Sequence, residues 1–120
     1  MTALRWLSIS AALFLGAAAA QAHAQLERAD PRVGSVIDAA PAAITLSFTE
    51  GIEPAFSAVE VTDSSGRRFD AGKVRVDRGN PSQAQISLKA LPAGRYTVRW
   101  RVLSRDAHRT EGSFTFEVRP

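Results

Sequence analysis

Short segments in which apolar and polar residues alternate follow one another along this chain. The longest is Tyr96–Val102, where Tyr96, Val98, Trp100 and Val102 occupy every second position. Successive side chains of a strand point to opposite faces, so this segment offers one apolar face to a core. The same alternation occurs in five further segments, which are 44–49, 58–62, 73–77, 85–89 and 113–118. After residue 22 no stretch keeps the apolar period of a helix, so the pattern predicts an all-β fold.

Turn-forming residues separate these segments at short intervals. They include Asp30-Pro31, Ser64-Ser65-Gly66, Gly79-Asn80-Pro81 and Pro92-Ala93-Gly94. About seven short strands with such spacing predict an antiparallel Greek-key β-sandwich of immunoglobulin-like or cupredoxin-like type. Tyr96, directly after the last of these turns, resembles the tyrosine corner of immunoglobulin-like sandwiches. Trp100 shares its apolar face and is expected in the core.

The first 22 residues have the features of a secretory signal peptide. Arg5 lies in a short basic start, an apolar run extends from Ala11 to Ala20, and Ala20-Gln21-Ala22 offers the small-x-small cleavage pattern. The apolar run is shorter than the roughly 20 residues that span a bilayer. We therefore predict a signal peptide at 1–22, export of the protein, and one domain at 23–120 that does not span the membrane. Ala22-His23-Ala24 also fits the pattern, so cleavage after Ala24 stays open.

The charge of the chain gives little support to nucleic-acid binding. Lys and Arg together number 15 against 12 Asp and Glu, for a formal net charge of +3. The basic residues are interspersed with acidic ones such as Asp63, Asp70 and Asp77, whereas a nucleic-acid surface gathers them on one face. There is no cysteine to act as a nucleophile or soft ligand.

Both histidines occupy positions from which they could bind a metal ion. Cleavage after Ala22 gives His23 a free α-amine beside its own imidazole, and these two nitrogens can chelate one ion. Extending the register of Tyr96–Val102 puts Ser104, Asp106 and His108 on one side, where the loop end could fold a carboxylate and an imidazole onto the same ion. Three nitrogens and one oxygen without sulfur suit Cu(II). An incidental histidine and a solvated Asp-x-His turn explain the same residues, and this alternative stays open.

The chain after residue 22 resembles the CopC-type periplasmic copper-binding proteins, which are small sandwiches of copper homeostasis and resistance. The motifs that carry the resemblance are His23–Leu26, Asp30-Pro31, Leu46–Glu50, Gly94–Val102, Ser104–His108 and Gly112–Phe116. The resemblance implies one Cu(II) per chain, held by the amine and imidazole of His23 together with Asp106 and His108. It also implies that Glu50, which ends Phe48-Thr49-Glu50, orients the chain start or an imidazole by hydrogen bonding. A strand-end carboxylate in water is the alternative for Glu50.

The same resemblance implies a monomeric copper carrier or buffer and not an enzyme. Its expected partners are the copper ion and an inner-membrane copper permease of the CopD type or other exported copper proteins. Some relatives carry a methionine-rich Cu(I) site, but the single methionine here is Met1, within the predicted signal peptide. Many relatives have proline after the late histidine, where this chain has Arg109.

Two other functions use the same residues. A copper mono-oxygenase-like enzyme would hold the ion in a brace of His23 and His108. Asp106 argues against it, because a carboxylate in the fourth equatorial position occupies the place that oxygen activation needs. A metal-free immunoglobulin-like exported module predicts no effect of copper on thermal stability.

Overall fold

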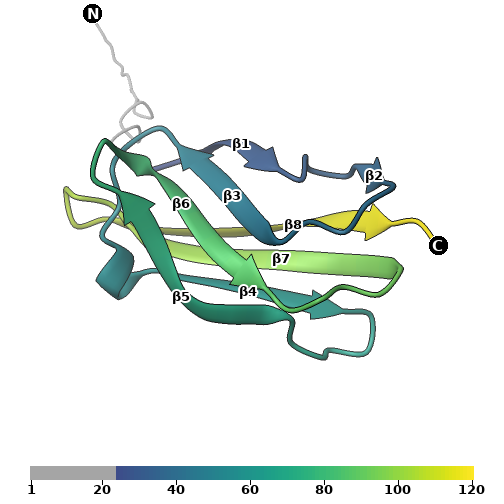
Figure 1. The fold of residues 1–120 in the computed structure, drawn as a ribbon. Coiled ribbons are helices and arrows are strands. Elements are labelled where there is room, and N and C mark those ends of the chain that lie inside the picture. Colours follow the sequence, from purple (N-terminus) through teal and green to yellow (C-terminus); the bar gives the residue numbers. More distant parts are fainter. Residues whose placement is uncertain (1–23) are drawn as a thin grey trace, which may run out of the picture.

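Two four-stranded sheets pack face to face in the computed structural model, which describes residues 24–120 (Figure 1). One sheet has the strand order β1-β3-β6-β5 and the other has the order β2-β8-β7-β4. The strands are β1 (Leu26–Asp30), β2 (Val36–Ile37), β3 (Ala43–Phe48), β4 (Ala58–Asp63), β5 (Asp70–Asp77), β6 (Asn80–Leu88), β7 (Gly94–Leu103) and β8 (Arg109–Val118). A short 3-10 helix, η2 (Pro54–Phe56), precedes β4. The predicted β-sandwich is confirmed.

Each alternating segment coincides with a strand, except that 44–49 and 85–89 extend one residue beyond β3 and β6, and the predicted set needs two corrections. β1 and β2 were not predicted as strands, and β8 begins at Arg109, four residues before the predicted start. β2 pairs with β8 in parallel, so the sandwich is not wholly antiparallel. Among residues 24–120, no helix is long and apolar enough to cross a bilayer. The predicted signal peptide at 1–22 lies outside the described residues.

Tyr96 forms the tyrosine corner that its position predicts. Its hydroxyl donates a hydrogen bond to the carbonyl of Pro92. Its ring stacks on Phe116 with centroids 5.5 Å apart and meets Phe69 edge-on at the same distance. Burial of the ring raises the pKa of the Tyr96 hydroxyl. These contacts fix the beginning of β7 in the core, and the strand then runs to the opposite end of the sandwich.

Trp100 lies on the same inward face of β7, nearer the end of the strand, and is buried as predicted. Its ring meets Phe48 of β3 edge-on at 5.3 Å between centroids. On the neighbouring strand its partner is Gly112, where an added Cβ would lie 2.6 Å from Cζ2 of the indole. Gly112 therefore leaves the space into which the indole packs.

Gly112→Ala is expected to destabilise the protein, because the new methyl group displaces the Trp100 ring. Overpacking of this kind costs about 1–3 kcal/mol in the free energy of unfolding, which urea denaturation measures. Gly79→Ala is the matched control, because its Cβ would find only Oδ2 of Asp77, at 3.9 Å. Unchanged stability in Gly112→Ala would contradict the packing described.

Candidate metal centre

A tight loop, residues 104–108, joins β7 to β8 and carries two of the predicted ligands. Leu103 and Arg109 form the last residue pair of the two strands. Beyond this pair, the Ser104 amide donates to the carbonyl of His108 at 2.9 Å, and the Ala107 amide donates to the carbonyl of Ser104 at 2.9 Å. Ala107 has a φ of 71°, the left-handed conformation that lets the chain reverse within so few residues. The loop is thus closed by its own backbone.

Asp106 and His108 come together on this loop. Oδ1 of Asp106 and Nδ1 of His108 are 3.2 Å apart, and the two side chains are 36% and 51% exposed. Two donor atoms that bind one ion at roughly 2.0–2.2 Å each, as in zinc sites, lie about 3 Å apart. The pair is therefore spaced as two neighbouring ligands of one metal ion, and solvent reaches both side chains.

Ser104 forms hydrogen bonds with both of these residues. It is fully buried, its hydroxyl donates to Oδ1 of Asp106, and its Oγ accepts from the His108 amide at 3.2 Å. The hydrogen bond from Ser104 is the main reason that the pKa of Asp106 is lowered, and the contact with His108 lowers it further. Asp106 therefore stays a carboxylate well into the acid range, which is the form that binds metal. The strand register predicted Ser104 on this side of the chain but gave no sign of its role.

The start of the described chain is fixed beside the same loop. Ala24 is fully buried, and its carbonyl accepts a hydrogen bond from the Thr110 hydroxyl at 2.7 Å. The Gln25 amide donates to Oγ1 of Thr49 at 2.9 Å, and the Thr49 amide donates to the Gln25 carbonyl at 2.9 Å. Thr110 is two residues after His108 on β8, so Ala24 is held close to the loop. His23 itself lies outside the described residues.

Glu50 follows β3 by two residues, next to residues that contact the start of the described chain and the 104–108 loop. Its neighbour Thr49 binds Gln25, and the carbonyl of its other neighbour, Gly51, accepts from the Arg105 amide at 3.0 Å. Glu50 is half-buried. The neighbours of Glu50 in the sequence thus contact both the start of the described chain and the 104–108 loop.

Arg105 and Arg109 flank the two candidate ligands. The side chain of Arg105 packs over Gly51, where an added Cβ would lie 3.0 Å from Cδ and Nε of the arginine. The guanidinium of Arg109 donates to the carbonyl of Phe56 in η2 at 3.4 Å. Arg109 therefore reaches towards η2.

Residues 24–120 contain no group of three or more His, Cys, Asp and Glu side chains that could hold a metal ion. Asp106 and His108 supply two donors, fewer than the four of a tetragonal copper site.

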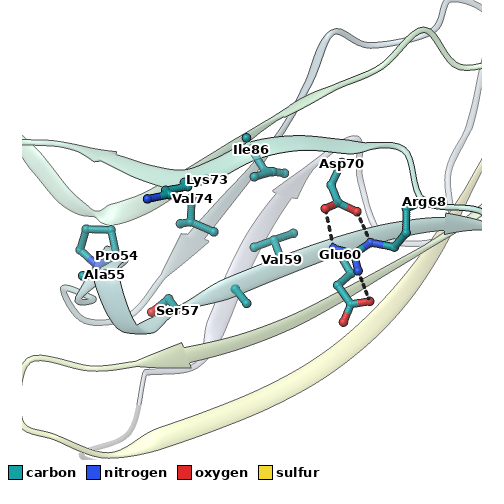
Figure 2. Close-up of a pocket in the computed structure, with 12 residues that line it drawn as sticks. Pro54, Ala55, Ser57, Val59, Glu60, Arg68, Asp70, Lys73, Val74 and Ile86 are labelled. Atoms are coloured by element: carbon teal, nitrogen blue, oxygen red, sulfur yellow. Dashed lines mark hydrogen bonds and ion pairs between the residues drawn. The ribbon is translucent and has the colours of Figure 1, made fainter.

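A pocket of about 590 Å³ lies elsewhere, between η2, β4 and β5 (Figure 2). Val59, Val74 and Ile86 contribute apolar surface to it. Three of its charged side chains bind one another: Arg68 lies 3.4 Å from Glu60 and 2.7 Å from Asp70. The hydrogen bond from Arg68 is the main cause of the lowered pKa of Asp70. None of the predicted ligands lines this pocket, and its ion pairs join the edges of the two sheets.

Comparison with known proteins gives a consistent assignment. Copper resistance protein C of Pseudomonas syringae pv. tomato is 37% identical over 120 residues, which cover 95% of this chain and 94% of that protein. Protein YobA of Escherichia coli is 36% identical over 99 residues, covering 82% and 80%. The crystal structure of CopC from Methylosinus trichosporium OB3b superposes with a TM-score of 0.78 at 33% identity, over 82% of this chain and 95% of that one. The methionine-rich copper resistance protein PcoC from Escherichia coli gives a TM-score of 0.71 at 35% identity, over 82% and 100%. Residues 26–119 match the CopC domain, and the chain therefore belongs to the CopC family.

Proposed function

We propose that this protein is a periplasmic carrier or buffer of Cu(II) in copper homeostasis or resistance. One ion per chain is held by the α-amine and imidazole of His23 together with Asp106 and His108. The observation that carries the proposal is the 3.2 Å pair of Asp106 and His108, beside which Ala24 is anchored. The names of the relatives, copper resistance protein C among them, support copper as the metal.

The burial of Ala24 supports cleavage after Ala22 over cleavage after Ala24. Ala24 is fully enclosed in the core, and its carbonyl is the acceptor for the Thr110 hydroxyl. Removal of this residue would take a packed side chain from the fold and leave the hydroxyl without its acceptor, which is unfavourable in a partly buried place. A mature chain that begins at His23 keeps both the buried Ala24 side chain and the hydrogen bond to Thr110.

The donor set suits the oxidised metal. Amine, imidazole and carboxylate ligands without sulfur favour a tetragonal Cu(II) ion, whereas Cu(I) prefers soft thiolate and thioether ligands. The chain has no cysteine, and its one methionine is Met1. We therefore propose that reduction to Cu(I) weakens binding and releases the ion, to an inner-membrane permease or to another exported copper protein.

A carrier fits this arrangement better than an oxidase. Asp106 is held towards His108 by Ser104 and is therefore preset as a fourth donor. With four equatorial donors present, the ion has no open equatorial position for oxygen. Binding, and not turnover, is the expected activity.

Copper is expected to stabilise the mature protein against heat. A ligand that binds only the folded state at 100 times its Kd adds about 2.7 kcal/mol, which corresponds to a rise of roughly 10–20 °C in Tm for a domain of about 100 residues. Thermal unfolding with and without one equivalent of Cu(II) measures this, after intact mass has established that the secreted chain begins at His23. Chelation of the copper should reverse the rise. An unchanged Tm would favour the metal-free module.

A further inference from the structure

We propose that Thr110 is a positioning residue for copper capture: its hydroxyl holds the carbonyl of Ala24 and thereby fixes the chain start beside His108. This inference rests on the proposed function, because it concerns how the two halves of that site are brought together. It assigns to Thr110 a role that its neighbours on β8 do not share.

Thr110 interrupts the apolar pattern of β8. The inward positions of this strand alternate with exposed ones and include Phe114, Phe116 and Val118, all of them buried. Thr110 occupies the same side of the strand and is half-buried, where a further apolar residue would continue the pattern. Its hydroxyl instead donates to the Ala24 carbonyl at 2.7 Å, across 86 residues of sequence.

A second hydroxyl binds the next residue, here as a hydrogen-bond acceptor. Oγ1 of Thr49 accepts from the Gln25 amide, and the Thr49 amide donates to the Gln25 carbonyl, both at 2.9 Å. Two consecutive residues are thus held by hydrogen bonds: Ala24 by Thr110 at the start of β8, and Gln25 by Thr49 directly after β3. Ala24 directly follows His23 in the sequence, so these hydrogen bonds act on the residues next to the proposed ligand.

These hydrogen bonds have a consequence for copper binding. Chain ends fray unless they are tied down, and ordering a frayed end at the moment of binding reduces affinity. Thr110 lies on β8, and His108 is the last residue of the loop that leads directly into this strand, so the start of β8 supports both the chain start and the late ligand. The chain start is therefore already ordered in the folded protein before copper binds, so that ordering it does not reduce the affinity for copper.

Thr110→Val removes the hydroxyl at nearly constant volume, and Thr110→Ser keeps it. Loss of an outer partner of a metal ligand typically costs 10–100-fold in affinity. We expect Thr110→Val to weaken Cu(II) binding by at least about tenfold, and Thr110→Ser to bind within about twofold of the wild type. Thr115→Val is the matched control, because Thr115 is an exposed threonine on the outward side of the same strand. It should bind as the wild type does.

A double-mutant cycle with His23→Ala separates positioning from general loss of structure. If Thr110 acts through the chain start, Thr110→Val weakens copper binding when His23 is present and has little further effect when His23 is absent. Competition titration with a chromophoric chelator gives the four affinities, and circular dichroism checks the fold of each variant. Thr49→Val, which removes the acceptor for Gln25, tests the same tie from the other strand.

Equal effects of Thr110→Val in both backgrounds would overturn the proposal, as would wild-type binding by Thr110→Val or weak binding by Thr110→Ser. Should Thr110→Val not fold, Thr49→Val in the same cycle decides: a loss of affinity that depends on His23 supports the proposal, and its absence overturns it. Failure of the proposed function gives a different result, because the wild-type protein itself would then show no copper binding through nitrogen ligands.

Discussion

His108→Ala is expected to lower the affinity for Cu(II) by more than about 100-fold, beyond the range for residues that act only through a ligand. The side chain is about half exposed, at 51%, so its removal leaves no cavity in the core. Its backbone still accepts from the Ser104 amide, which keeps the loop closed. Competition titration should therefore show lost affinity in a protein whose unfolding without copper is nearly unchanged.

Asp106→Asn and Asp63→Asn form a matched pair that tests whether the effect belongs to this loop. Both carboxylates accept hydrogen bonds within a turn, and hydrogen bonds lower the pKa of each. Asp63 pairs with Tyr96 near the start of β7, whereas Asp106 follows the end of that strand. We expect Asp106→Asn to weaken copper binding at least about tenfold and Asp63→Asn to leave it unchanged. Equal affinities for the two variants, or copper binding by His108→Ala at the wild-type level, would place the metal elsewhere.

A chain that begins at Gln25 is expected to bind Cu(II) about 10²–10⁴-fold more weakly than one that begins at His23, the range typical when one of two linked contacts is lost. Such a chain lacks both nitrogens of the proposed chelate and keeps only Asp106 and His108. Calorimetric titration of the two proteins at the same pH measures the difference.

Acetylation of the α-amine of the His23 chain is the control that isolates the amine, since every side chain is retained. We expect intermediate affinity and one fewer nitrogen donor. If the blocked protein, or the shorter one, bound copper as tightly as the mature protein does, the chain start would have no part in the site.

The strands were predictable where alternation is strong and unpredictable where side chains serve another purpose. Tyr96–Val102 lies within β7 because each of its inward positions is apolar. The first half of β8 was missed because its inward residues are Thr110 and Gly112, which face the Ala24 carbonyl and the Trp100 ring. β1 was missed because a register shift between Leu26 and Arg28 puts its inward residues, Leu26 and Ala29, three positions apart, so that they show no two-residue period. β2 was missed because a strand of two residues is too short to show a period.

The candidate site likewise has residues that the sequence predicts and residues that it does not. Asp106 and His108 could be found from their spacing and from the resemblance, since they are close in sequence and lie on one loop. The tie between Thr110 and Ala24 joins residues 86 apart, and that between Thr49 and Gln25 joins residues 24 apart. Hydrogen bonds over such separations leave no local pattern in a sequence, so only the fold reveals them.

Electron paramagnetic resonance of the secreted, processed protein, titrated with Cu(II), tests most directly whether the chain start and the β7–β8 loop bind one ion. A shared ion predicts a single axial species, complete at one equivalent, with coupling to three nitrogens in the wild type and to two nitrogens in His108→Ala. A spectrum with one nitrogen or none, or one that His108→Ala leaves unchanged, would contradict it.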